Sequence, residues 1–189
     1  MTADPEAAAG DAVARCLAAS PTLGAGRLLC VDGPSGSGKT TFARSLRRAV
    51  PGGTSVRVVH LDALYPGWDG LAEGVDRVGR DLLTPLSAGR PGGYRRYDWL
   101  AGREADRVEV APVDLLVLEG VGAGGDATFA SWVTLLVWVE APLSVRSARA
   151  VARDGIATEP QLEAWRRQED AWFAEHRTRD RADVVVATG

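Results

Sequence analysis

The stretch at 33–40 constrains the fold of this chain more than any other part of the sequence. It reads Gly-Pro-Ser-Gly-Ser-Gly-Lys-Thr and matches the pattern G-x-x-x-x-G-K-[ST] at every fixed position. An apolar run at 27–32 precedes it, and a segment of helical composition at 40–50 follows it. This strand–loop–helix context is the one that the pattern requires. The sequence therefore predicts an α/β fold in which a glycine-rich loop opens a helix.

Such a loop binds phosphate because its glycines let successive backbone N–H groups turn toward phosphate oxygens. The N-terminus of the following helix adds a partial positive charge. We expect Lys39 to reach the β- and γ-phosphates of a nucleotide and the hydroxyl of Thr40 to bind Mg²⁺. The residues expected to hold the nucleotide are Gly33, Ser35, Gly36, Ser37, Gly38, Lys39, Thr40 and Thr41.

Apolar runs and helical segments alternate along most of the chain. The further strands are predicted at 55–62, 115–120, 133–142 and 183–187, and the further helices at 6–19, 143–153 and 159–178. Short apolar strands that alternate with helices predict a parallel sheet covered on both faces. We therefore expect a three-layer α/β/α sandwich of the P-loop NTPase class, with a five-stranded parallel sheet, formed by residues 1–189 as a single domain.

Residues 63–112 interrupt this alternation. They are rich in glycine, proline and aromatic residues, and we expect them to be irregular apart from one helix around 73–87. A long insertion in a small domain is usually functional or disordered. Its tyrosines and tryptophans argue against disorder, so we interpret 63–112 as a region that binds a second substrate.

Composition excludes several classes of protein. The 22 basic and 25 acidic residues leave a net charge of −3, which argues against a general nucleic-acid binder. No apolar run approaches the roughly 18 residues that would span a bilayer. The two cysteines, Cys16 and Cys30, form neither a disulfide framework nor a zinc site. We expect a cytoplasmic protein without nucleic-acid or membrane partners, and the composition leaves its oligomeric state open.

Two carboxylates are predicted to lie beside the loop. Glu119 ends the strand at 115–120, and Asp62 ends the strand at 55–62. Ligands of open α/β sheets bind at the carboxyl ends of the strands, where Lys39 also lies. Glu119 is the expected partner of Thr40 in binding Mg²⁺. Asp62 could bind the ion through water or accept the proton of an attacking hydroxyl, or it could simply cap the next turn.

Arginines follow the fourth strand at a helical spacing. Arg146, Arg149 and Arg153 lie three and four residues apart, which places them on one face of a helix. We interpret 143–158 as a lid whose arginines neutralise a triphosphate, with a plain surface helix as the alternative. The chain has no Asn-Lys-x-Asp run of the kind that recognises guanine in GTP-dependent switches. Transfer of a phosphoryl group to a small acceptor fits these features better than a switch or a motor.

Several of these motifs together resemble the uridine kinase family of P-loop small-molecule kinases, which is related to phosphoribulokinase and bacterial pantothenate kinase. The resemblance rests on Gly-Pro-Ser-Gly-Ser-Gly-Lys-Thr-Thr, on Asp-x-Leu-Tyr at 62–65, on Tyr-Asp-Trp at 97–99, on Leu-Leu-Val-Leu-Glu-Gly at 115–120 and on Arg-x-x-x-Arg-Asp at 149–154. Their order and approximate spacing hold across 28–187. The resemblance implies an ATP- and Mg²⁺-dependent transferase.

The resemblance also implies roles for individual residues. Asp62 corresponds to the catalytic aspartate that activates the acceptor hydroxyl, and Glu119 to the acidic metal ligand. Arg149 and Arg153 correspond to the arginines of the lid, and Lys39 is the lysine of the phosphate loop. The residues expected to contact the acceptor are Tyr65, Trp68, Arg96, Tyr97 and Arg103, of which Tyr65 and Trp68 could equally serve in packing.

The acceptor region departs from the family pattern. Uridine kinases carry a histidine shortly after the Tyr-Asp-aromatic element, whereas this chain has Leu-Ala-Gly-Arg-Glu at 100–104. His60 falls inside a strand and is expected to pack in the interior. The acceptor is therefore a nucleoside or another small metabolite. A nucleoside monophosphate kinase, with Arg95, Arg96 and Arg103 on the acceptor phosphate, a regulatory nucleotide-binding protein and a slow ATPase are the alternatives.

Overall fold

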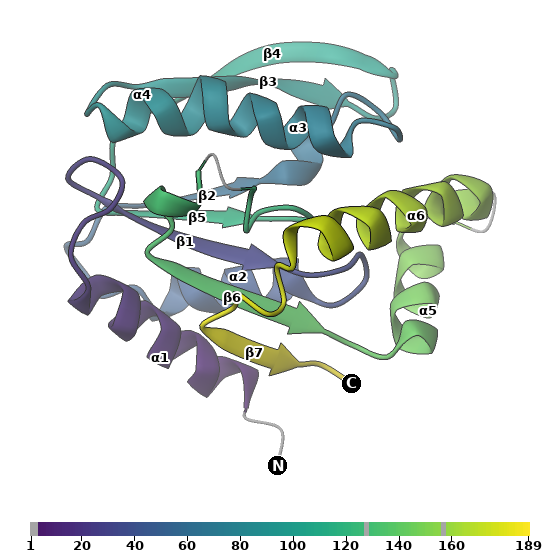
Figure 1. Cartoon of the computed structure of the whole chain (residues 1–189), viewed down its shortest axis with the longest axis horizontal. Helices are drawn as coiled ribbons and strands as arrows, with labels where there is room; N and C mark the ends of the chain where they lie inside the picture. The colour runs from purple at the N-terminus through teal and green to yellow at the C-terminus, as the bar shows by residue number, and fades with distance from the viewer. Residues whose placement is uncertain (1–3, 127–128, 156–157) are drawn as a thin grey trace.

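A parallel five-stranded sheet forms the centre of the molecule, as predicted (Figure 1). The computed structural model describes residues 4–126, 129–155 and 158–189. The strands are β1 (Arg27–Asp32), β2 (Val56–His60), β5 (Leu115–Glu119), β6 (Leu135–Glu140) and β7 (Val184–Ala187). Their order is β2-β5-β1-β6-β7, so the strand that leads into the glycine loop lies in the middle. The sequence places each of these strands within two residues of its observed ends.

Helices cover both faces of this sheet and give the predicted three-layer sandwich. One face carries α1 (Pro5–Ala18) and α2 (Lys39–Ala49), and the other carries α3 (Leu71–Arg77), η2 (Val78–Leu83), α4 (Thr84–Ser87) and α6 (Glu159–His176). Successive residues of β1 face opposite cores, because Leu29 packs with α1 and α2 whereas Cys30 packs with α3 and α6. Helix α5 (Leu143–Asp154) follows β6 at the carboxyl end of the sheet (Figure 1).

The insertion at 63–112 is more regular than the sequence suggests. A short η1 (Leu61–Ala63) comes first, the helical run α3–η2–α4 follows, and β3 (Gly92–Asp98) and β4 (Arg103–Val110) then form an antiparallel hairpin. The expectation of an irregular region was wrong because these strands carry charged residues on their exposed side. The hairpin packs closely on the helical run, since a Cβ on Gly92 would lie 2.5 Å from the carbonyl oxygen of Leu82.

The two cysteines belong to the interior of the protein. Cys16 and Cys30 are both buried and unpaired in the part of the chain that the structure describes. Burial raises the pKa of Cys16 to about 11, so its thiol is protonated and unreactive at neutral pH. No helix within residues 4–126, 129–155 and 158–189 has both the length and the apolar character needed to cross a membrane.

A buried carboxylate fixes the two loops at the carboxyl edge of the sheet. Asp32, at the end of β1, is fully buried and accepts hydrogen bonds from the backbone N–H groups of Gly33, Gly122 and Gly124 at 2.7–2.9 Å. Burial raises the pKa of Asp32 to about 6, an effect that these N–H groups and the charge of Lys39 partly offset. The glycine-rich turn after β5 is therefore tied to the start of the glycine loop.

Replacing Asp32 with alanine is expected to destabilise the fold. The change leaves three buried N–H groups without an acceptor, which we expect to lower the free energy of unfolding by about 3 kcal/mol. Urea unfolding followed by circular dichroism measures this difference. The control is Asp11→Ala on the exposed side of α1, which should change stability by no more than about 0.5 kcal/mol. Equal stability of the two variants would contradict this role for Asp32.

Candidate functional site

The glycine loop joins β1 to α2 and surrounds a small cavity. Gly36 and Gly38 have φ angles of 76° and 98°, which residues other than glycine rarely adopt. A Cβ on Gly36 would also lie 2.4 Å from the carbonyl oxygen of Arg146. The cavity measures about 200 Å³ and is lined by Ser35, Gly36, Gly38, Lys39, Thr40, Thr41, Asp62, Glu119, Arg149, Ala150 and Arg153. We refer to it as the donor cavity.

Two of the predicted loop residues lie behind this cavity. The backbone of Gly33 donates to Asp32, and a Cβ on Gly33 would lie 2.1 Å from the carbonyl oxygen of Val139. The side chain of Ser37 is fully buried, and its hydroxyl has no hydrogen-bond partner among the described residues. Gly33 and Ser37 therefore shape the loop, whereas the other predicted residues line its interior.

The side-chain oxygen atoms beside the loop suit a magnesium ion. Thr40 Oγ1 donates a hydrogen bond of 2.6 Å to Oε1 of Glu119. The second oxygen of Glu119, Oε2, is buried without a hydrogen-bond partner in the described part of the chain. Magnesium in phosphate-transferring proteins is held by one or two carboxylates or hydroxyls together with the phosphates. Thr40 and Glu119 together supply such a pair of oxygen ligands.

His60 belongs to the site rather than to the interior. Its side chain is 47% exposed, and Nδ1 lies 3.2 Å from Oε1 of Glu119. Burial alone would raise the pKa of Glu119, but the hydrogen bond from His60, the charge of Lys39 and the hydrogen bond from Thr40 lower it below its usual value. The expectation that His60 packs inside was therefore wrong. Glu119 is held in its charged form, as a metal ligand requires.

Asp62 lies in η1, directly after β2, at the same edge of the sheet. Solvent reaches its carboxylate, yet the surrounding walls displace much of its water, and this desolvation raises its pKa. The negative charge of Glu119 raises the pKa further, whereas Lys39 and Arg153 oppose the effect. The arrangement increases the basicity of a carboxylate that lines the donor cavity.

A second and larger cavity adjoins the first. It measures about 630 Å³ and is lined by Ser35, His60, Asp62, Ala63, Tyr65, Trp68, Arg96, Tyr97, Trp99, Leu100, Arg153, Thr158, Leu162 and Trp165. Trp99 lies with its ring edge-on to Trp68 and to Tyr97, with centroids 5.1 Å apart in each pair. Its indole N–H donates to the carbonyl oxygen of Asp62 at 2.7 Å, which attaches the hairpin to η1. We refer to this space as the acceptor cavity.

The residues predicted to contact an acceptor differ in their placement. Trp68, Arg96 and Tyr97 line the acceptor cavity. Tyr65 also borders it, but its ring is 1% exposed and its hydroxyl donates to the carbonyl oxygen of Val121. Arg103 lines neither of the two cavities. Packing is therefore the main role of Tyr65, and the structure gives no support to an acceptor contact by Arg103.

The three arginines of α5 reach the donor cavity to different extents. Arg149 donates to the carbonyl oxygen of Gly36 and to Oγ1 of Thr188, at 3.3 and 3.0 Å. Arg153 lines both the donor cavity and the acceptor cavity. Arg146 instead donates to the carbonyl oxygen of Ala141 and borders neither cavity. Two of the three arginines predicted on one face therefore lie at the site.

Comparison with known proteins relates the chain to curated kinases. No family model matches the chain. The chain is 31% identical over 147 residues to the uridine kinase of Halobacterium salinarum. The aligned stretch covers 70% of this chain and 64% of that relative. It is 30% identical over 140 residues to the uridine kinase of Latilactobacillus sakei, which covers 67% and 66% respectively. The chain spans slightly less than two thirds of the length of these curated relatives.

The fold has a close counterpart among solved structures. A possible uridine kinase from Bacillus stearothermophilus superimposes with a TM-score of 0.68 at 22% sequence identity. The superposition covers 95% of this chain and 98% of that one. This chain is thus a homologue of curated uridine kinases, and its fold is that of the P-loop kinases.

Proposed function

We propose that this protein is a small-molecule kinase that transfers the γ-phosphoryl group of ATP to a hydroxyl group of an acceptor. The observation that carries the proposal is the position of Asp62, which lines the donor cavity and the acceptor cavity at once. A carboxylate at the junction of the two spaces is where a base must stand to receive the proton of an attacking hydroxyl. Homology to curated uridine kinases supports the same class of reaction.

The chain's own groups would share the work of the transfer. The acceptor oxygen forms a bond to the γ-phosphorus, the bond to the bridging oxygen breaks, ADP leaves, and Asp62 takes the hydroxyl proton. Lys39 and Arg153 neutralise charge that spreads over the phosphoryl oxygens. Thr40 and Glu119 would hold Mg²⁺, which screens the charge of the β- and γ-phosphates when it is bound. Arg149 holds the lid against the loop through Gly36.

The acceptor cavity supports a neutral acceptor with a flat ring, of which a nucleoside is the first candidate. Its volume of about 630 Å³ falls within the range of small-molecule sites. Trp68, Tyr97 and Trp99 offer ring faces and edges for stacking. A nucleoside monophosphate is less well supported, because Arg96 pairs with Asp106 at 2.8 Å and Arg103 lies outside the cavity.

A transfer screen with the purified full chain tests the proposal. Mg²⁺ and ATP are held constant while nucleosides, nucleoside monophosphates, sugars and vitamin alcohols are supplied one at a time, and both ADP release and the phosphorylated product are measured. We expect at least one uncharged hydroxyl acceptor to stimulate ADP release and to appear as its phosphate ester. ADP release that is independent of every acceptor would indicate an ATPase. Nucleotide binding without turnover would indicate a regulatory protein.

A further inference from the structure

Helix α6 contacts the donor side and the acceptor side of the site through two adjacent residues. Oε1 of Glu169 accepts a hydrogen bond of 2.9 Å from the backbone N–H of Ser35 in the glycine loop. Nε2 of Gln168 donates a hydrogen bond of 2.7 Å to the carbonyl oxygen of Trp68. Trp68 lies in the stretch 61–70 after β2, which we call the acceptor segment. Adjacent helical residues point about 100° apart, so this turn of α6 lies between the two segments.

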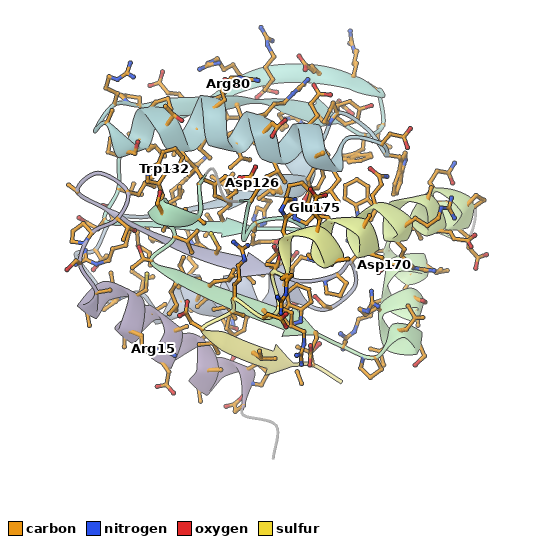
Figure 2. The ribbon with its side chains drawn as sticks, in the orientation of Figure 1. Arg15, Arg80, Asp126, Trp132, Asp170 and Glu175 are labelled. Atoms are coloured by element: carbon orange, nitrogen blue, oxygen red, sulfur yellow. The ribbon has the colours of Figure 1, made fainter. Side chains whose placement is uncertain are left out.

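Glu169 is buried, although it has no part in the proposed reaction. Glu169 is 1% exposed, whereas its neighbour Asp170, labelled on α6 in Figure 2, is exposed. A buried carboxylate is costly unless hydrogen bonds compensate for the lost water, and the Ser35 N–H gives such a bond. A negative group beside an anion-binding loop also weakens phosphate binding. Its presence therefore points to a role in holding the loop rather than in binding the nucleotide.

The same helix is packed firmly against the acceptor segment. Trp165 is 5% exposed, and its ring centroid lies 4.8 Å from that of Tyr65 and 6.4 Å from that of Trp68. Trp165 and Leu162 also form part of the wall of the acceptor cavity. Movement of α6 would therefore displace both the glycine loop and the segment that follows Asp62.

We propose that α6 couples the two cavities, with Glu169 and Gln168 as positioning residues. Nucleotide bound in the glycine loop restrains Ser35, this restrains α6 through Glu169, and Gln168 passes the restraint to the acceptor segment at Trp68. The inference rests on the proposed function, since it requires a nucleotide in the donor cavity. When a first ligand rigidifies a helix that both sites share, a second ligand loses less conformational entropy on binding. Donor and acceptor therefore bind with positive cooperativity.

Hydrogen–deuterium exchange of the full chain tests this coupling without knowledge of the acceptor. The probe is ADP with Mg²⁺, and exchange is followed by mass spectrometry in the peptide that covers 61–70. We expect bound ADP to slow exchange in 61–70 by about fivefold, the size that one net hydrogen bond supports. Nucleotide affinity is measured on the same samples by calorimetry.

Variants on α6 separate coupling from simple stability. Gln168→Ala is expected to bind ADP as the wild type does but to lose the slowing in 61–70. Glu169→Ala is expected to lose it as well, and Glu169→Gln, which keeps an acceptor oxygen for the Ser35 N–H, is expected to retain it. Gln161→Ala, on an exposed part of the same helix, is the matched control and should behave as the wild type.

The outcomes distinguish failure of this inference from failure of the proposed function. Bound ADP that leaves exchange in 61–70 unchanged in the wild type would overturn the coupling alone. Slowing that persists in full in Gln168→Ala would overturn it too, even if Glu169→Ala fails to fold. A protein that binds no ADP at any concentration would overturn the proposed function and the coupling with it.

Discussion

Replacing Asp62 with asparagine is expected to lower kcat of acceptor-dependent ADP release by about 1,000-fold. Asparagine has nearly the same shape but cannot take a proton from the acceptor hydroxyl. Nucleotide binding should persist, because the glycine loop and Lys39, which also line the donor cavity, are unchanged in the variant. The measurement combines steady-state kinetics, with the best acceptor from the transfer screen, and calorimetric titration of the variant with ADP and Mg²⁺.

Asp69 offers a matched control for this substitution. It is an exposed carboxylate of the same segment and lines neither cavity. Asp69→Asn should therefore leave kcat and KM unchanged. If Asp62→Asn retained nearly full activity, the proton would have to leave by another route and Asp62 would not be the base. If the variant lost ADP binding as well, the aspartate would act mainly in holding the metal or the loop.

The central sheet could be predicted because its strands are short apolar runs, and three of them, β1, β5 and β6, are buried along nearly their whole length. The loop pattern fixes one strand and one helix, and the requirement that parallel strands end at the same edge brings Asp62 and Glu119 beside Lys39. Register pairs His60 with Glu119 and Val31 with Glu119, which puts these strand ends in adjacent positions. The donor half of the site therefore followed from local patterns and one topological rule.

The acceptor half could not be predicted in the same detail. The strands of the hairpin carry many charged residues, which mask the alternation of apolar and polar positions. Only the structure pairs Tyr97 with Glu104. His60 and Glu169 contact partners 59 and 134 residues away in the sequence. No local pattern distinguishes a histidine or glutamate that will meet such a partner from one that lies on the surface.

The same limit applies to α5, where the sequence predicts the spacing of the three arginines but not which of them border the donor cavity. Arg146, Arg149 and Arg153 do recur on one helix, as the sequence indicates. Only the folded chain distinguishes Arg146, whose Nε donates back to Ala141, from the two that border the donor cavity. This difference within one helix provides the control for the second large effect.

Replacing Arg153 with alanine is expected to lower kcat/KM on the order of 10³-fold, because removal of an arginine that stabilises the transferring phosphoryl group commonly has an effect of this size. Arg153 is placed for that role because it lines both cavities beside Asp62. Arg153→Lys should recover only part of the loss, since an ammonium group is a point charge without the planar, forked geometry of guanidinium. Kinetics with the best acceptor measure each variant.

Arg146→Ala is the matched control, because it removes an arginine from the same helix without altering either cavity. It should keep kcat/KM within about threefold of the wild type, a change of about 0.7 kcal/mol in activation free energy, because the Arg146 side chain touches neither cavity. If Arg146→Ala and Arg153→Ala lost activity equally, the effect would belong to the stability of the lid helix. If only Arg153→Ala lost activity, and mainly through a lower kcat, the guanidinium of Arg153 would act on the phosphoryl group during its transfer. Its position beside both cavities is consistent with that role.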